Sequence, residues 1–224
     1  MPVSAPVRVR VEVWSDVVCP WCYIGKRRLE QALERFEHAG EVEVVWRGFQ
    51  LDPQFPQGVR RPVPEMLAEK MNASPGQVRQ MQARVTQIAA QEGLAYDLEH
   101  SIMVNTIDAH RLLHLAGEHG LAGQAHERLM RAQLIERQIV DDPETLVRLG
   151  VEIGLPEEET RRVVESNAHR EDVENDFREA RALGITGVPF FVLNRAYGVS
   201  GAQPVEVFAS ALRTAYDNAA APAR

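Results

Sequence analysis

The chain has 224 residues, of which 45% are hydrophobic and 25% are charged, and these proportions are ordinary for a soluble globular protein. Thirty-two acidic and 25 basic residues leave a formal net charge of -7, which disfavours a nucleic-acid partner or an anionic membrane surface. The longest apolar runs are only a few residues long, so we expect no membrane-spanning segment. The first residues lack the apolar core of a secretory signal, and we therefore expect a cytoplasmic protein.

The chain has two cysteines, Cys19 and Cys22, in a C-x-x-C pattern. A structural disulfide framework is excluded, because the loop between them is too short to stabilise a fold of this size. A zinc site built from three or four cysteines is excluded as well. The pair is therefore a redox pair, or half of a mixed cysteine–histidine metal site, or two small buried side chains.

The first segment of the chain has the pattern of a strand, a helix and a second strand. Valines alternate with polar residues over residues 7–13, which predicts a strand with one polar face and places Glu12 on the solvated side. Apolar residues at helical spacing then predict a helix that ends near Gly40. Alternation over residues 42–46 predicts the second strand. A right-handed crossover would make the two strands parallel.

The middle of the chain carries only helical patterns, and its end returns to sheet. Ser74 opens one helix with a capping-box pattern. Further helices are predicted near residues 105–119, 121–140, 143–153, 156–165 and 169–183. Residues 190–199 have the pattern of a short hairpin, and Gln203-Pro204 precedes a last helix. This order favours an α/β protein in which both chain ends build one sheet, with a helical domain inserted between them.

The sequence Cys19-Pro20-Trp21-Cys22 falls at the junction of the first predicted strand and helix. Cys19 would be the N-cap, Pro20 the first helical residue and Cys22 a residue of the first turn. A sulfur at the N-cap faces unpaired N–H groups and the positive end of the helix dipole, which favour the thiolate, the nucleophile of disulfide exchange. Cys22 would resolve the mixed disulfide. A C-x-x-C sequence in this setting is typical of a redox pair.

Four motifs carry a resemblance to a known family. They are Ser15-Asp16-Val17-Val18-Cys19-Pro20-Trp21-Cys22-Tyr23-Ile24-Gly25, Asn105-Thr106 with Ala109-His110-Arg111-Leu112, Gly187-Val188-Pro189-Phe190-Phe191, and Val199-Ser200-Gly201-Ala202-Gln203-Pro204. With these motifs the chain resembles the FrnE-like branch of the DsbA-type thioredoxin-fold oxidoreductases. The resemblance runs from about residue 9 to 216. The related 2-hydroxychromene-2-carboxylate isomerases and kappa-class glutathione transferases carry serine at the position of Cys19.

The resemblance implies a thioredoxin-like fold with a large all-helical insertion domain. Residues 1–53 and 184–224 would form the thioredoxin-like domain, and residues 54–183 would form the insertion. It also implies that the Val188–Pro189 bond is cis, that Pro189 lies beside the cysteines, and that the Val188 backbone pairs with an extended substrate. The substrate-binding residues that we infer are Pro20, Trp21, Asn105, His110, Val188, Gly201 and Gln203.

Two departures from the wider family pattern bear on the chemistry. Trp21 stands where DsbA has a histidine that stabilises the thiolate, so we expect a weaker oxidant. Thioredoxin-like enzymes commonly place a buried acid six residues before the first cysteine, and that position is Val13 here. Asp16 is the candidate proton acceptor for Cys22. An acid in such a turn also serves as a turn former, and both roles stay open.

These observations predict a thiol-disulfide oxidoreductase that acts on protein or small-molecule thiols and disulfides. The reaction needs no metal and no organic cofactor, and glutathione is a candidate co-substrate. The protein would be a monomer or a homodimer, with its cysteine pair largely reduced in the cytoplasm. Two alternatives remain, a glutathione-dependent isomerase or transferase of small aromatic substrates, and a module whose C-x-x-C binds metal.

Overall fold

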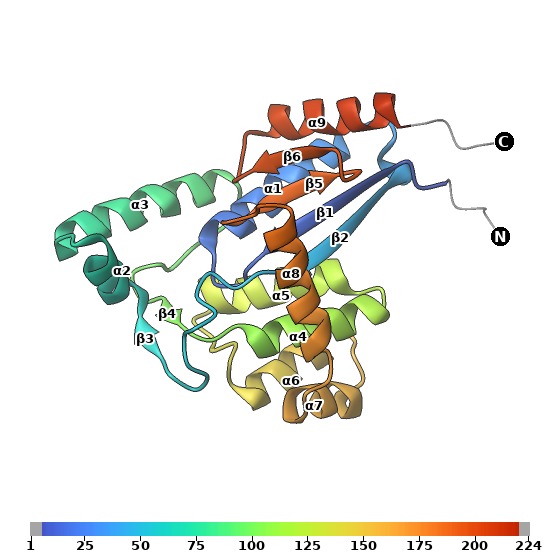
Figure 1. Ribbon diagram of the computed structural model, residues 1–224. Helices are drawn as coiled ribbons and strands as arrows, with labels where there is room; N and C mark the ends of the chain where they lie inside the picture. Colours follow the sequence, from blue (N-terminus) through green and yellow to red (C-terminus); the bar gives the residue numbers. More distant parts are fainter. Residues whose placement is uncertain (1–5, 220–224) are drawn as a thin grey trace.

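A four-stranded mixed sheet forms the centre of the computed structural model, which describes residues 6–219 (Figure 1). Its strand order is β2-β1-β5-β6, with β1 (Val9–Ser15), β2 (Val42–Gly48), β5 (Phe190–Leu193) and β6 (Tyr197–Ser200). β1 and β2 are parallel, whereas β5 is antiparallel to both β1 and β6. Both chain ends therefore contribute to one sheet, as predicted. The expectation that the chain lacks a secretory signal depends in part on residues 1–5, which lie outside the described range.

Two helices cover one face of the sheet. α1 (Pro20–Glu34) and α9 (Val205–Asn218) lie side by side there, and Figure 1 shows α9 along the top of the view. The buried face of β1 meets them in one apolar cluster, whose members include Val11, Val13, Leu29, Phe208 and Leu212. Alternation along β1 thus fixes which residues face α1, because successive side chains of a strand point to opposite faces.

Helices cover the opposite face of the sheet and form most of the rest of the molecule. α8 (Arg170–Ala182) contacts β2, and α4 (Ile107–Glu118) contacts α8. α4 shares a second apolar core with α5 (Ala122–Leu134), α6 (Pro143–Glu152) and α7 (Glu157–Glu165). α2 (Val63–Met71) and α3 (Pro75–Gln91) stand to one side of the sheet, near the short strands β3 (Arg61–Pro62) and β4 (Ile102–Met103). The division of the chain at residues 53 and 183 stays a prediction.

Several element boundaries differ from the sequence expectation. α1 ends at Glu34, and Gly40 lies in a separate short 3-10 helix, Ala39–Glu41. α5 ends at Leu134 rather than near residue 140, because Arg137 soon afterwards adopts a positive φ of 57°, which an α-helix does not accommodate. α2, β3 and β4 were not predicted; each strand has only two residues, and none of the nine α2 residues is fully buried. The capping box at Ser74 is confirmed.

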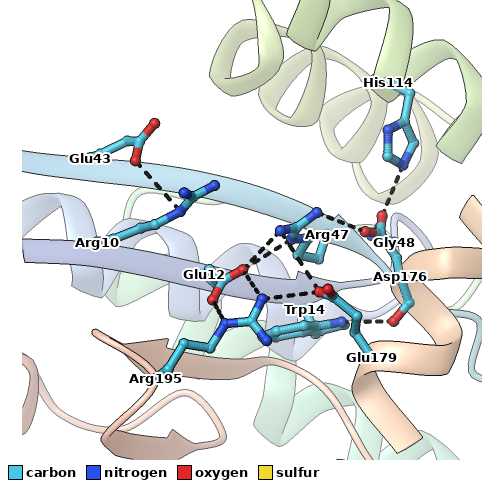
Figure 2. Close-up of polar contacts among 10 residues, drawn as sticks. All are labelled: Arg10, Glu12, Trp14, Glu43, Arg47, Gly48, His114, Asp176, Glu179 and Arg195. Carbon is cyan, nitrogen blue, oxygen red and sulfur yellow. Dashed lines mark hydrogen bonds and ion pairs between the residues drawn. The ribbon is translucent and has the colours of Figure 1, made fainter. Parts of the chain in front are cut away.

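Glu12 lies on a buried face of the sheet, so its predicted solvated position is wrong. Its side chain is only 2% exposed, because α8 covers this face of β1 (Figure 2). The carboxylate accepts hydrogen bonds from Arg47 over 2.9 Å and from Arg195 over 2.6 Å. Arg47 also pairs with Asp176 of α8 over 3.2 Å. Valine–polar alternation alone cannot distinguish a solvated face from one covered by a later helix.

The two arginines determine the charge state of Glu12. Burial by itself raises the pKa of this carboxyl, but the hydrogen bonds from Arg195 and Arg47 outweigh burial, so its pKa lies below the ordinary value. Asp176 extends the network across the same face, where it accepts from the Gly48 N–H over 2.8 Å and lies 2.8 Å from His114 Nε2. The Asp176 carbonyl accepts from the Trp14 indole over 3.1 Å. These contacts fasten α8 to the sheet.

Replacing Glu12 by glutamine tests this network. We expect Glu12→Gln to lower the free energy of unfolding by about 2 kcal/mol at neutral pH, since charge-assisted hydrogen bonds are lost at a buried position. A carboxyl whose pKa is depressed in the folded state stabilises above its unfolded pKa and loses that contribution as the pH falls through the folded value. The difference between variant and wild type in urea unfolding should therefore shrink below about pH 4.3.

Glu43→Gln is the matched control for that measurement. Glu43 is 45% exposed and pairs with Arg10 over 3.5 Å on the neighbouring strand, and exposed pairs of this kind contribute little. The unfolding free energy of the Glu43→Gln variant should differ from that of the wild type by less than about 0.5 kcal/mol. Equal losses in the two variants would show that burial of Glu12 has no special consequence.

Candidate active site

The two cysteines lie where β1 passes into α1. β1 ends at Ser15 and α1 begins at Pro20, so the chain turns within residues 16–19. The Cys19 N–H donates to the Asp16 carbonyl over 3.1 Å, which closes this turn. Cys19 has the extended backbone of an N-cap, with φ of -87° and ψ of 113°, and Pro20 is the first helical residue. The predicted positions of Cys19 at the N-cap, Pro20 as first helical residue and Cys22 in the first turn are confirmed.

The two thiols differ in their surroundings, although both are free and largely buried. Cys19 is 4% exposed, and Cys22, one turn further in, is 1% exposed. Burial raises the pKa of Cys22 well above its ordinary value, and the neighbouring Cys19 raises it further. The Asp16 N–H lies 3.5 Å from the Cys22 sulfur and donates to it. Cys22 is therefore a thiol at neutral pH in the reduced protein.

The loop before β5 lies against Cys19. The Val188–Pro189 bond is cis, in agreement with the expectation from the family resemblance. The Cys19 thiol donates to the Val188 carbonyl over 3.7 Å. Gly25 of α1 permits the close approach of this loop, since a Cβ at Gly25 would lie 3.0 Å from Pro189 Cγ. The Pro189 carbonyl in turn accepts from the Gly201 N–H over 2.8 Å, which ties the loop to the end of β6.

An apolar cavity of about 870 Å³ opens beside Cys19. Val18, Cys19, Pro20, Trp21 and Val188 form the wall on the cysteine side. Trp21 is 38% exposed, an unusual position for so large an apolar side chain. The opposite wall comes from the helical region and includes four methionines, Met66, Met71, Met81 and Met103. Methionine side chains adapt to differently shaped ligands, so this wall suits more than one substrate.

Tyr96 is a residue of the site that the sequence analysis missed. It lies in the segment between α3 and β4, and its hydroxyl donates to the Pro20 carbonyl over 2.7 Å. Burial raises the pKa of this phenol, so it stays a hydrogen-bond donor. Tyr96 thus ties the first turn of α1 to the helical region. No local pattern marks it, because the contact spans 76 positions of sequence.

A second group of charges holds α1 from its other side. Lys26, almost fully buried, pairs with Glu127 of α5 over 2.8 Å, and Tyr23 donates to the same carboxylate over 2.5 Å. Burial alone raises the pKa of Glu127, but the hydrogen bonds from Lys26, Tyr23 and Arg27 outweigh it and lower the pKa to about 2. Glu127 is therefore ionised at neutral pH and anchors α1 to α5.

Asp16 is buried beneath the turn that carries the cysteines. One of its carboxylate oxygens accepts from the Leu51 N–H over 2.8 Å, and the other lies 3.4 Å from His110 Nε2. The hydrogen bond from Asp16 to Cys22 comes from its backbone N–H and not from its side chain. This carboxylate orders the turn and the chain after β2. Its role as a proton acceptor stays a prediction.

Four predicted substrate-binding residues do not line the cavity: Asn105, His110, Gly201 and Gln203. Asn105 accepts from the Ile107 N–H over 2.9 Å at the start of α4. His110 is fully buried, with Nε2 3.0 Å from the Phe49 carbonyl. α9 begins at Val205, so the turn before it holds Gly201 and Gln203, and the Gln203 amide donates to the Ser200 carbonyl. Binding of substrate by these four residues stays a prediction.

Neither a metal cluster nor a membrane span is found in the described part of the chain. Over residues 6–219 no three histidine, cysteine, aspartate or glutamate side chains are placed to hold a metal ion. No helix in the same range is long and apolar enough to cross a membrane. The expectation of a reaction without metal or organic cofactor stays a prediction.

Comparison with known proteins defines the family. A model of the DSBA-like thioredoxin domain matches residues 10–213. The chain therefore belongs to this family, and it has the thioredoxin-like α/β fold expected from the sequence. The crystal structure of the probable DsbA oxidoreductase SCO1869 from Streptomyces coelicolor is 46% identical, with a TM-score of 0.92, and the match covers 96% of this chain and 93% of that one.

Two more distant structures share the fold alone. One is a 2-hydroxychromene-2-carboxylate isomerase, with a TM-score of 0.70 and 15% identity over 94% of this chain and 98% of that one. The other is the cytosolic disulfide reductase DsbM from Pseudomonas aeruginosa with GSH, with a TM-score of 0.59 and 21% identity over 92% of this chain and 98% of that one. The expected relation to the 2-hydroxychromene-2-carboxylate isomerases is confirmed at the level of the fold, and the relation to the kappa-class glutathione transferases stays a prediction.

Removal of the Tyr96 hydroxyl should loosen the first turn of α1. We expect Tyr96→Phe to lower the free energy of unfolding by about 1 kcal/mol and to raise the alkylation rate of Cys19 about fivefold, because the turn opens more often. Tyr216→Phe removes a hydroxyl that donates to Glu41 over 3.0 Å, far from the thiols. This control should leave the alkylation rate unchanged, and a similar increase in both variants would contradict the role of Tyr96.

Proposed function

We propose that the protein is a thiol-disulfide oxidoreductase of the DsbA and FrnE type, with Cys19 as nucleophile and Cys22 as resolving thiol. The observation that carries the proposal is the position of Cys19 at the N-cap of α1, beside the Val188 carbonyl and at the wall of an open apolar cavity. Cys22 lies behind it in the same turn and away from that opening. A disulfide substrate in the cavity would therefore meet Cys19 first.

The chemistry is a sequence of two thiol-disulfide exchanges. The Cys19 thiolate attacks one sulfur of a substrate disulfide, forms a mixed disulfide and releases the first substrate thiolate. Cys22 then loses its proton and attacks the Cys19 sulfur, which forms the Cys19–Cys22 disulfide and releases the second thiolate. Two electrons pass to the substrate, and the two thiol protons of the pair end on the substrate thiols. The reverse sequence oxidises a dithiol.

The lining of the cavity favours two kinds of substrate, peptides and small thiols, with an apolar group beside the sulfur. Its four methionines and Trp21 offer apolar contact, whereas Arg61, Lys70, Asp52 and Glu69 add charges of both signs to its lining. Glutathione is a candidate co-substrate, and the fold shared with a disulfide reductase solved with GSH favours it. The Val188 backbone N–H would pair with an extended substrate, as in our sequence-based expectation.

The proposed setting is the cytoplasm, where glutathione and thioredoxin systems keep such a pair largely reduced. In that setting the protein would act chiefly as a reductase. We propose a reaction without metal or organic cofactor, carried out by a monomer or a homodimer.

The isomerase or transferase alternative finds less support in the site. The family resemblance implies that proteins of that kind carry serine at the position of Cys19. Gly201 and Gln203 lie in the turn before α9, which begins at Val205, and neither residue lines the cavity beside Cys19. We therefore keep disulfide exchange as the proposed function.

Substitution of each cysteine tests the proposal. Cys19→Ser should abolish reduction of insulin disulfides, because the nucleophile is lost, and should form no mixed disulfide. Cys22→Ser should instead accumulate mixed disulfides with substrate, which mass spectrometry of the acid-quenched reaction detects. In the wild type, iodoacetamide should modify Cys19 before Cys22, since Cys22 is protonated and less exposed. Faster labelling of Cys22 would reverse the two roles, and full activity of Cys19→Ser would overturn the proposed function.

A further inference from the structure

Two buried glutamines line the cavity beside Cys19, and the proposed exchange does not use them. Gln82 belongs to α3 and Gln133 to α5, so they reach the cavity from two different helices. Gln82 is 6% exposed and Gln133 is 5% exposed. Glutamine is mostly an exposed residue in folded proteins, so two buried glutamines in one cavity wall indicate a specific role.

The amide nitrogen of each glutamine is held by a backbone carbonyl. Gln82 Nε2 donates to the Leu98 carbonyl over 3.0 Å, and Gln133 Nε2 donates to the Ile102 carbonyl over 2.6 Å. Leu98 and Ile102 line the same cavity. A carbonyl only accepts hydrogen bonds, so these contacts fix which end of each amide faces the backbone. The oxygen of each amide is therefore directed away from its anchor.

The two amide oxygens have no partner within the protein. Among residues 6–219 no donor reaches Gln82 Oε1 or Gln133 Oε1, and both oxygens are buried. Most buried polar atoms of side chains are hydrogen-bonded, and a buried acceptor without a donor costs stability. Two such acceptors in the lining of one cavity, beside the candidate nucleophile, are therefore suited to a ligand that brings its own donors.

We propose that Gln82 and Gln133 determine specificity by accepting hydrogen bonds from amide N–H groups of the substrate. The cavity then selects disulfides carried by peptides, glutathione included, over alkyl disulfides without such groups. This inference rests on the proposed function. A cysteine within a peptide brings two neutral donors close to its sulfur, its own N–H and that of the next residue. Neutral acceptors in an apolar wall match neutral donors, whereas a buried ammonium group would need a carboxylate beside it.

The substrate reaches the two oxygens by displacing side chains of the cavity wall. Met81 and Met103 belong to that wall, and methionine side chains rearrange readily because they are long and unbranched. The oxygens are already removed from water, so an N–H group that reaches them gains a hydrogen bond with no loss of hydration on the protein side. A substrate without the N–H leaves the acceptors unpaired, and sites of this kind discriminate strongly against such analogues.

Two disulfides of the same shape test this selection in the wild-type protein. The first is the disulfide of N-acetylcysteine methylamide, and the second is its diester analogue, in which oxygen replaces each amide N–H. Acid quenching and mass spectrometry measure how fast each compound oxidises the reduced protein, and the rate with free dithiothreitol corrects for intrinsic reactivity. We expect the corrected rate constant to be roughly tenfold larger for the diamide. The advantage should lie in the apparent dissociation constant rather than in the limiting rate.

Substitution of each glutamine identifies the acceptors. Gln82→Leu and Gln133→Leu should each lower the ratio of the diamide rate constant to the diester rate constant roughly fivefold, because one acceptor is lost. A purely structural role would slow both compounds alike and leave this ratio unchanged. Gln87→Leu on α3 and Gln124→Leu on α5 are the matched controls, since both glutamines are exposed and neither lines the cavity. Both controls should keep the wild-type ratio.

A binding measurement separates this inference from the proposed function. The Cys19→Ala variant is titrated with S-methylated N-acetylcysteine methylamide, and the indole NMR signal of Trp21, which lines the cavity, reports binding. Adding Gln82→Leu should weaken binding roughly fivefold, and this readout needs no exchange activity. Equal corrected rates for diamide and diester in the wild type, or a wild-type ratio in both glutamine variants, overturn the inference. Binding that depends on Gln82 in a protein that exchanges neither disulfide overturns the proposed function alone.

Discussion

The position of one helical turn, residues 19–22, is the constraint on which the candidate site depends. Three separate parts of the chain hold that turn, through four contacts. The Asp16 carbonyl closes it from β1, the Val188 carbonyl contacts the Cys19 thiol, Tyr96 binds the Pro20 carbonyl, and Gly25 lets Pro189 pack closely against α1. A nucleophile at a helix N-cap is useful only if the helix keeps its direction toward the substrate. The contacts from sheet and helical region together provide that direction.

Buried charges fasten helices to one face of the sheet and to one another. Glu12 with its two arginines joins β1 to β2 and to the turn after β5, and Asp176 brings α8 onto the same face. Lys26 and Glu127 join α1 to α5 on the other side. Burying a charge is costly unless it is paired and hydrogen-bonded, and each of these carboxylates has at least two donors. Their geometry therefore favours one relative placement of helices and sheet over others.

The sequence patterns predict the part of the site that neighbouring residues form. They do not predict the part formed by contacts between distant segments. The two cysteines, Pro20 and the strand-to-helix turn lie within a few residues, so spacing and helix-cap chemistry were sufficient to place them. Val188 and Pro189 came from resemblance to a family. Tyr96 and the burial of Glu12 depend on segments far along the chain, and no alternation or capping pattern records which segment will cover a given face. Asn105 and His110 were assigned to substrate from a motif, although their hydrogen bonds serve α4 and the chain after β2.

The contrast between the two sulfurs follows from the strand beneath them. A helix N-terminus offers its free N–H groups to the N-cap residue, whereas a residue one turn later depends on what the sheet presents to it. Here the chain directly after β1 presents the Asp16 N–H, a neutral donor, to the Cys22 sulfur. Neutral donors respond to a negative charge without themselves changing protonation, so they do not fix the resting state of Cys22 as a buried carboxylate would. The resolving thiol thus stays protonated at rest, yet it has a donor in place when the disulfide opens.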